Sequence, residues 1–264
     1  MLNGLDLFSG IGGLSYALAE WVRPVAYCEI EAYARGVLLS RMFQGELPVR
    51  PIWDDVKTLH GRMLPSVDII YGGFPCQDIS VAGLGKGLEG ERSGLFFEIL
   101  RLVDEARPKF IFLENVPAIT IRGLSTVTAE ITKRGYDCRW CTLSAQEVGA
   151  PHKRERWWLL AYSNGVRKLQ QEGGEQEIGR RIGNLCQNVS YPRCEQSRSA
   201  QESEWTSIYT TGCSWWSTEP DVGRVANGIP CRVDRIRGLG NAVVPLQARE
   251  AFKRLMGLTE KKEG

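Results

Sequence analysis

The chain has 264 residues, of which 43% are hydrophobic, and a formal net charge of +2 at pH 7. This composition is ordinary for a globular protein and excludes wholesale disorder, while the nearly neutral charge neither requires nor excludes a nucleic-acid partner. No apolar run approaches the roughly 20 residues that a membrane-spanning helix needs, and no signal peptide is visible, so we expect a cytoplasmic protein without a membrane partner.

Two strand–helix units are predicted in the first part of the chain. A short buried strand over residues 5–8 leads into a glycine-rich loop, residues 9–13. A helix should follow, because apolar residues recur there with helical spacing; they are Leu14, Ala17, Leu18 and Trp21. A second strand over residues 25–28 ends at Glu29, and a second helix is predicted from about residue 32 to residue 41.

The same alternation continues to about residue 161. The further predicted elements are a strand at 67–71, a glycine-rich loop from Gly72 to Ser93, a helix with its apolar face from Leu95 to Ala106, a strand at 110–113, a helix marked by Leu124, Val127 and Ile131, and strand-like runs around Trp140 and at 157–161. Strands that alternate with helices predict an α/β fold, a doubly wound Rossmann-like parallel sheet with helices on both faces. In such sheets ligands bind at the carboxyl ends of the strands.

The composition changes near residue 163. From there to about residue 221 the chain is polar, with few periodic apolar residues and with basic and acidic side chains nearly balanced. We therefore divide the chain into a main domain with the candidate cofactor-binding and catalytic residues (1–162), a small polar insertion (163–221) and a C-terminal return (222–264). The insertion is either a partly flexible segment or a small recognition lobe. A helix opened by Pro245, with Ala248, Ala251 and Leu255 on one face, predicts the return to the main domain.

The first loop has the features of a nucleotide site. Its glycines let the backbone approach a ligand closely, and the N-terminus of the helix after it offers unpaired N–H groups. Glu29, roughly 20 residues further on at the end of the next strand, is placed to accept hydrogen bonds from ribose hydroxyls. The chain has no P-loop sequence, which argues against phosphoryl transfer. We predict a nucleoside-containing cofactor, with a tight structural turn as the alternative for the loop alone.

Cys76 follows a predicted strand directly, in a loop with two glycines and Pro75. These neighbours favour a nucleophilic thiolate at the ligand-binding edge over a buried structural cysteine. Glu114 ends the next strand, where it could be the acid or hydrogen-bond partner of a bound base, with a turn-capping carboxylate as the alternative. Arg154 and Arg156 precede an apolar strand, and alternation puts them on one face, where they could hold a phosphate or a substrate carbonyl; a solvated charge run is the alternative.

The eight cysteines are scattered along the chain, which favours reduced thiols over a disulfide framework. Cys138 and Cys141 form a C-x-x-C pair within a strand-like run, but no second pair accompanies them. We therefore expect no metal site.

Five segments, taken together and in this order, resemble the C5-cytosine DNA methyltransferase family. They are the cofactor loop (residues 6–13), the nucleophile loop and its extension (residues 73–77, Ser80, residues 82–83 and 92–96), the Glu-Asn-Val element (residues 114–116), the paired arginines (Arg154 and Arg156) and the C-terminal element that completes the cofactor pocket (residues 240–245). The chain departs from the family at His152, where the family usually has Gln.

The resemblance implies methylation of carbon 5 of cytosine in DNA, with S-adenosyl-L-methionine as the methyl donor. Cys76 would add to C6 of a flipped-out cytosine while Glu114 holds N3 and the exocyclic amine, with Arg154 and Arg156 positioning Glu114 or the cytosine carbonyl. The residues implied to bind the cofactor are Asp6, Phe8, Gly10, Ile11, Gly12, Glu29 (ribose), Ile30, Asp55 (adenine amino group), Val56, Leu95, Asn241 and Val243. Those implied to bind the base or the DNA are Phe74, Pro75, Gln77, Ser80, Arg224, Arg232 and Arg235.

The expected partners are double-stranded DNA and a cognate restriction endonuclease, and a monomer from a bacterium or its phage is favoured. A tRNA cytosine methyltransferase with the same nucleophile loop is one alternative; the glycine-rich extension after Cys76 and the Arg-rich C-terminal element favour DNA. A catalytically silent DNA-binding regulator is another, although binding alone requires neither Cys76 nor Glu114. A small-molecule methyltransferase would share only the cofactor loop.

Overall fold

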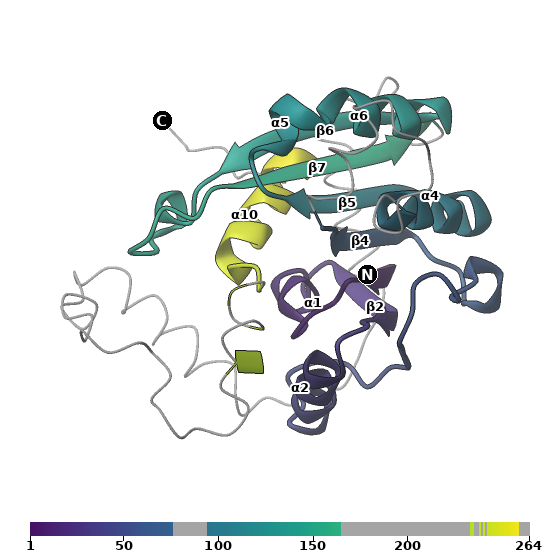
Figure 1. The fold of residues 1–264 in the computed structure, drawn as a ribbon, viewed down its shortest axis with the longest axis vertical. Helices are drawn as coiled ribbons and strands as arrows, with labels where there is room; N and C mark the ends of the chain where they lie inside the picture. The colour runs from purple at the N-terminus through teal and green to yellow at the C-terminus, as the bar shows by residue number, and fades with distance from the viewer. Residues whose placement is uncertain (76–93, 165–232, 235–237, 239, 241, 259–264) are drawn as a thin grey trace.

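A computed structural model describes residues 1–75, 94–164, 233–234, 238, 240 and 242–258. The described residues contain a seven-stranded sheet in the order β3-β2-β1-β4-β5-β7-β6 (Figure 1). Its strands are β1 (Leu2–Leu7), β2 (Val22–Cys28), β3 (Ile52–Trp53), β4 (Ile69–Gly73), β5 (Phe110–Asn115), β6 (Tyr136–Leu143) and β7 (Arg156–Ser163). The helices are α1 (Gly13–Ala17), α2 (Ala32–Phe43), α4 (Gly94–Ala106), α5 (Ile119–Arg122), α6 (Leu124–Lys133) and α10 (Pro245–Met256), with 3₁₀ turns η1 (Gly61–Met63) and η3 (Gln146–Val148).

The sheet is parallel from β3 through β5, but β7 runs antiparallel to both β5 and β6. The prediction of a wholly parallel sheet is therefore wrong at this edge. The connection from β6 to β7, all of which the structure describes, contains only η3 and turns. The chain therefore folds back as a hairpin. A parallel pair of strands would need a longer crossover, usually a helix. Because β7 is antiparallel, its first residues lie beside the carboxyl end of β5, where Glu114 pairs with Trp158.

Helices cover both faces of the sheet, as predicted. α4, α5 and α6 pack on one face and α1 and α10 on the other (Figure 1). Neighbouring strand residues supply the two cores in alternation: Ile70 and Ile111 belong to the first, Ile69 and Phe112 to the second. Covering on both faces explains why the central strands read as nearly continuous apolar runs.

α1 is shorter than predicted. The spacing of apolar residues favoured a helix through Trp21, but α1 ends at Ala17 and the chain turns over residues 18–21. The backbone N–H of Leu2 donates to the carbonyl of Trp21 at 2.8 Å, which brings the chain into the sheet directly after the turn. Leu18 and Trp21 still pack in the same core as Leu14. The helical spacing of these four apolar residues therefore reflects their burial in one core and not a continuous helix.

The other predicted elements are present, with boundaries moved by a few residues. β2 begins earlier than predicted, and Gly72 and Gly73 end β4 instead of beginning a loop. β3 and α5 were not predicted. α10 begins at Pro245 and is followed by Gly257 in the left-handed conformation (φ 70°), a common helix end. Most of the expected insertion, residues 165–221, lies outside the described residues. In the described part of the chain, no helix combines the length and apolarity needed to cross a membrane.

Candidate active site

A cavity of about 610 Å³ lies at the carboxyl ends of β1, β2, β4 and β5. This is the edge at which sheets of this type bind ligands. Many of the residues singled out in the sequence line it: Phe8, Gly10, Ile11, Glu29, Ile30, Asp55, Val56, Phe74, Pro75, Leu95, Glu114 and Arg156. The cavity therefore joins candidate cofactor-binding and base-binding residues in one space.

Glu29 is the buried acidic residue on the cofactor side of this cavity. Its Oε2 accepts a hydrogen bond from the backbone N–H of Gly10 at 2.7 Å, and its Oε1 accepts one from Glu31 at 2.8 Å. The carboxylate thereby joins the glycine loop after β1 to the chain after β2. A carboxylate oxygen can accept more than one hydrogen bond, so Glu29 keeps acceptor capacity for ligand hydroxyls.

Three residues implied to bind the cofactor lie behind the cavity wall instead. Asp6 is fully buried, Gly12 has a left-handed φ of 83°, and Val243 packs near the start of α1. A Cβ at Gly12 would stand 2.5 Å from Leu47 Cδ1, so this position needs glycine for both its backbone and its space. Gly12 is part of the glycine loop and Val243 lies next to Gly13, but neither they nor Asp6 are among the residues that line the cavity.

The carboxyl group of Asp6 belongs to a buried polar cluster beneath the glycine loop. Its Oδ2 accepts a hydrogen bond from Ser15 at 2.5 Å, and the Ser15 hydroxyl lies 2.7 Å from that of Tyr71. Within the described part of the chain, Asp6 Oδ1 has no hydrogen-bond partner. Burial raises the pKa of Asp6 to about 7, against the hydrogen bond from Ser15, which lowers it. A proton on this carboxyl is the form that a buried, poorly partnered group favours.

Glu114 and Arg156 form an ion pair on the opposite wall of the cavity. Arg156 Nε lies 2.9 Å from Glu114 Oε1, and both side chains are largely buried. Burial raises the pKa of Glu114, although the charges of Arg156 and Arg154 act in the opposite direction. The pair can therefore present to a ligand a carboxyl group that is fixed in direction and holds its proton more readily than an exposed one.

Gly73 makes room for this carboxyl. The register of β4 with β5 places Gly73 opposite Glu114, and a Cβ at Gly73 would stand 2.6 Å from Glu114 Oε2. Any larger side chain would displace the carboxyl group from its present position. The second glycine of the loop sequence therefore serves the site through close approach to Glu114.

Arg154 does not share a strand face with Arg156, which corrects the sequence prediction. β7 begins at Arg156, and Arg154 precedes it with φ 29°, a rare value for a residue with a side chain. Its Nη2 donates to the carbonyls of Gly240 at 2.9 Å and Ala242 at 2.5 Å. Arg154 thus holds the C-terminal element, two residues of which line the cavity, and acts on Glu114 only through its charge.

Cys76, the candidate nucleophile, lies outside the described residues, as do Gln77, Ser80, Arg224, Arg232, Arg235 and Asn241. The backbone that leads to Cys76 is described up to Pro75, which lines the cavity. Asn115 Nδ2 donates to the carbonyl of Phe74 at 2.9 Å, and Asn115 is itself buried. The residue after Glu114 therefore fixes the chain just before the candidate nucleophile.

Sequence reasoning missed several wall residues. Tyr33 comes from the first turn of α2, and Gly238 lies just before the C-terminal element. Asn115 and Val116 could have been chosen, because they directly follow Glu114 at a strand end. Gly238 has no comparable local signal, because its place near Ile11 and Tyr33 depends on the path of the returning chain.

The C-x-x-C pair lies on β6, where a spacing of three puts the two side chains on opposite faces. Cys138 packs against the core that includes α4, and Cys141 against the core that includes α10. Over the described residues, no group of three or more His, Cys, Asp or Glu side chains could hold a metal ion.

Comparison with known proteins gives consistent matches. A family model described as C-5 cytosine-specific DNA methylase matches residues 2–218. The type II methyltransferase M.CviJI of Paramecium bursaria Chlorella virus IL3A is 30% identical over 258 residues, which cover 94% of this chain and 58% of that protein. M.HhaI of Haemophilus parahaemolyticus is 34% identical over 170 residues, 62% of this chain and 50% of that protein. The crystal structure of the S. pombe Dnmt2 methyltransferase matches with a TM-score of 0.51 at 25% identity, over 62% of this chain and 51% of that one. The chain thus spans between 50% and 58% of the length of these curated relatives.

Proposed function

Because the chain belongs to the C-5 cytosine-specific DNA methylase family, we propose that it transfers a methyl group from S-adenosyl-L-methionine to carbon 5 of cytosine in double-stranded DNA. One observation carries the proposal. A single cavity has the Gly10–Glu29 loop pair on one wall and the Glu114–Arg156 ion pair on another. A methyltransferase of bases needs both halves within reach of each other, because donor and acceptor must meet.

The residues on the cofactor side fit S-adenosylmethionine. Glu29 has acceptor capacity for the ribose hydroxyls, and Asp55, which also lines the cavity, would hold the adenine amino group. Apolar wall residues provide surface for the adenine and the methionine chain; they are Phe8, Ile11, Ile30, Val56 and Leu95. The acidic side chains of this wall suit a ligand that carries a positive sulfur. When bound, the cofactor supplies an electrophilic methyl group.

The residues on the opposite wall fit a cytosine taken out of the DNA stack. The Glu114 carboxyl, with its raised pKa, would donate its proton toward N3 while its other oxygen accepts from the exocyclic amine. Arg156 would keep that carboxyl in place through the 2.9 Å ion pair. Cys76, next in sequence after Pro75, would form a bond from its sulfur to C6, which makes C5 electron-rich. After methylation, a base such as water would take the C5 proton, so that the C5–C6 double bond forms again and the bond from C6 to the Cys76 sulfur breaks.

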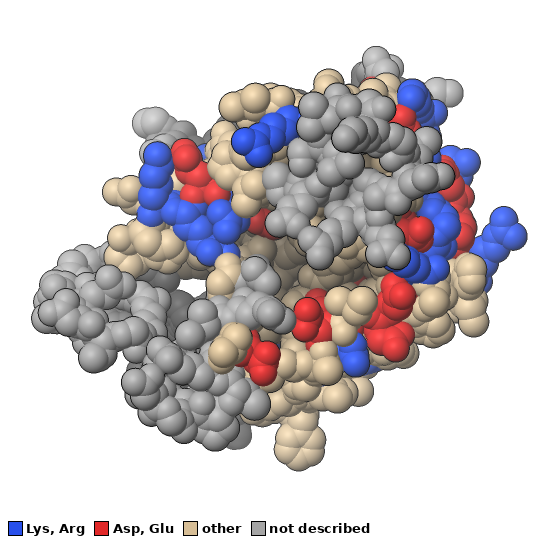
Figure 2. Space-filling model, in the orientation of Figure 1, with Lys and Arg blue, Asp and Glu red and all other residues tan. Residues whose placement is uncertain are grey.

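The distribution of charged side chains around the cavity supports the binding of a polyanionic substrate on its basic side. Figure 2 shows Lys and Arg side chains gathered near the start of β7 and Asp and Glu side chains nearer α2. Lys153 and Arg154 precede β7 in the sequence, and Arg156 is its first residue. We propose that the DNA backbone approaches on this basic side, with Arg224, Arg232 and Arg235 as further phosphate contacts and Gln77 and Ser80 near the base. Residues 163–221 are the proposed recognition lobe.

The experiment is methylation of DNA by the purified chain with methyl-labelled S-adenosylmethionine, followed by nucleoside mass spectrometry. We expect 5-methylcytosine in double-stranded DNA and none in tRNA. Cys76→Ser should abolish it while cofactor binding persists, and Cys138→Ser on β6 should leave it unchanged. An adduct with DNA that contains 5-fluorocytosine should resist denaturant in the wild type only. A chain that binds the cofactor but modifies only tRNA, or a fully active Cys76→Ser variant, would overturn the proposal. A restriction endonuclease of the same site specificity is the proposed partner.

A further inference from the structure

The segment from Asp54 to His60 forms one wall of the cavity at the edge of the sheet. It follows β3, which pairs with β2 through only two residues. Asp55 and Val56 line the cavity, while Val56 and Leu59 point apolar groups into the core. The backbone of the segment therefore has little support from the sheet, although four residues of the cavity wall, Asp54 to Lys57, depend on its position.

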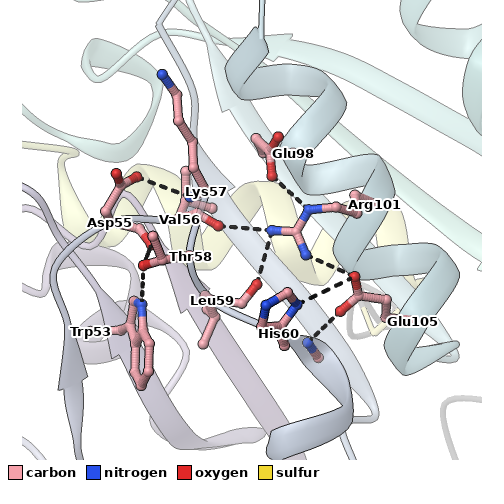
Figure 3. Close-up of polar contacts among 11 residues, drawn as sticks. Trp53, Asp55, Val56, Lys57, Thr58, Leu59, His60, Glu98, Arg101 and Glu105 are labelled. Atoms are coloured by element: carbon pink, nitrogen blue, oxygen red, sulfur yellow. Dashed lines mark hydrogen bonds and ion pairs between the residues drawn. The ribbon is translucent and has the colours of Figure 1, made fainter.

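Arg101 holds this segment from α4, on the side away from Asp55 (Figure 3). Its Nη2 donates to the carbonyls of Val56 and Leu59, both at 2.9 Å. On α4 itself, Arg101 Nε donates to Glu98 at 2.6 Å and Nη1 donates to Glu105 at 2.8 Å. The two carboxylates fix the plane of the guanidinium, so its remaining nitrogen points at the two carbonyls.

Glu105 extends the connection by one more bond. Its Oε2 accepts from the backbone N–H of Gly61 at 2.6 Å, where η1 begins. Side chains of one helix thus hold the segment at Val56 and Leu59 and hold the residue that follows it, Gly61. α4 itself is fixed, because Ile99, Leu102 and Val103 are fully buried. The same helix supplies Leu95 to the cavity, so one rigid element sets two parts of its wall.

We propose that Arg101 is a positioning residue for the cofactor: it sets cofactor affinity by holding the backbone of Val56 and Leu59, without touching the cofactor. The inference rests on the proposed function in one respect, that this cavity takes S-adenosylmethionine. The guanidinium donates four hydrogen bonds at once: one to Glu98, one to Glu105 and two to the backbone carbonyls of the segment. A lysine has one ammonium group on a flexible stem and cannot reproduce this geometry, although it keeps the charge beside Glu98 and Glu105.

The experiment is calorimetric titration of the full chain with S-adenosylmethionine and with S-adenosylhomocysteine. For Arg101→Met and Arg101→Lys, we expect the Kd of both ligands to rise by about tenfold or more, because hydrogen bonds from a charged group to the wall are lost. With DNA as substrate, KM for the cofactor should rise while kcat at saturating cofactor stays within about twofold. Hydrogen exchange of peptides that cover residues 54–60 should become faster in both variants.

Arg134→Met is the matched control. Arg134 joins α6 to α4 through Asp104 at 2.9 Å and also donates to the carbonyl of Glu130 at 2.8 Å. Its side chain is 21% exposed, against 29% for Arg101, and it is not among the residues that line the cavity. This variant should lose thermal stability while its cofactor Kd stays at the wild-type value.

The outcomes separate the inference from the proposed function. A wild-type chain that binds neither ligand would refute the cofactor assignment and the inference with it. A wild-type chain that binds, together with Arg101→Lys at wild-type Kd, would overturn the inference alone, because the charge would then be sufficient. If Arg101→Met fails to fold, Arg101→Lys decides the question through its Kd and the exchange rates of residues 54–60.

Discussion

The Asp6→Asn variant should remove a pH-dependent loss of stability from the folded protein. Burial raises the pKa of Asp6 from 3.8 to about 7 in the folded state, whereas unfolding exposes the carboxyl to water and restores its ordinary pKa. Between these values the folded protein keeps a proton that the unfolded chain has released. The contribution of Asp6 to stability is therefore fully present below about pH 3.8 and is lost as the pH rises to about 7.

The size of the effect follows from the shift. One pKa unit corresponds to about 1.4 kcal/mol, so a shift from 3.8 to about 7 amounts to a loss of about 4 kcal/mol at high pH. An asparagine keeps an oxygen that can accept the hydrogen bond from Ser15, but it does not titrate. The free energy of unfolding of Asp6→Asn minus that of the wild type should therefore rise by about 1 kcal/mol per pH unit from pH 5 to pH 7 and then level off.

Urea unfolding at pH 5, 6, 7 and 8 measures this difference. Subtracting the wild type removes the titration of all the other groups, which the two proteins share. Asp104→Asn, which removes a carboxylate from the exposed ion pair with Arg134, is the control and should give a difference without this slope. If the curves of wild type and Asp6→Asn stay parallel from pH 5 to pH 7, the raised pKa of Asp6 has no effect on folding and the reasoning fails.

Two further substitutions test other parts of the site, and a third tests a buried residue of α10. Glu29→Ala should weaken S-adenosylmethionine binding by about 1–3 kcal/mol, measured by calorimetry; an unchanged Kd would reduce Glu29 to a tether of the Gly10 backbone. Gly73→Ala should displace the carboxyl of Glu114 and lower methyl transfer at saturating cofactor by about 100-fold with cofactor affinity kept, and activity near that of the wild type would contradict the close approach. Gln247→Leu removes hydrogen bonds of 2.7 and 2.8 Å from a buried amide to two backbone carbonyls and should lower the free energy of unfolding by about 2 kcal/mol; a loss below about 0.5 kcal/mol in urea unfolding would show that other groups replace them.

The strand-end residues were predictable from the sequence because local patterns specify them. An apolar run followed by glycines or by a carboxylate marks the end of a buried strand, and parallel strands end at one edge. Gly10, Glu29 and Glu114 were found in this way, and the structure places all three around one cavity. The alternation of strands and helices along the sequence was enough to predict that these three residues lie at one edge of the sheet.

The direction of β7 was not predicted, and the error came from treating every strand as part of a strand–helix unit. A signal was present, because residues 144–155 contain no apolar pattern long enough for a crossover helix. The misplaced pair of arginines is a separate error, which concerns the residue at which the strand begins. Alternation along a strand applies to Arg156, which begins β7, but not to Arg154, which precedes it with a positive φ.

Contacts between a side chain and a distant backbone carbonyl lie beyond any sequence pattern. Arg101 and Val56 are 45 positions apart and belong to different elements, yet their hydrogen bond shapes the cavity wall. Periodicity reports which face of a helix is buried, and Arg101 lies among polar residues of α4 that this criterion treats as solvent-facing. Only the packing of α4 against η1 brings the guanidinium to the segment.

Within the part of the chain that the structure describes, Arg101 is one of four arginines that act in the same way on the cavity wall. Each donates to backbone carbonyls of one wall segment: Arg35 to Glu29 and Ile30, Arg41 to Ile11, Arg101 to Val56 and Leu59, and Arg154 to Gly240 and Ala242. Much of the wall consists of loops that begin where the strands end, and the hydrogen bonds of the sheet do not extend to these loops. A guanidinium suits this place because its donors diverge in one plane and stay charged at any relevant pH. The sheet thus fixes where the cavity lies, and the arginines fix the backbone that gives the cavity its shape.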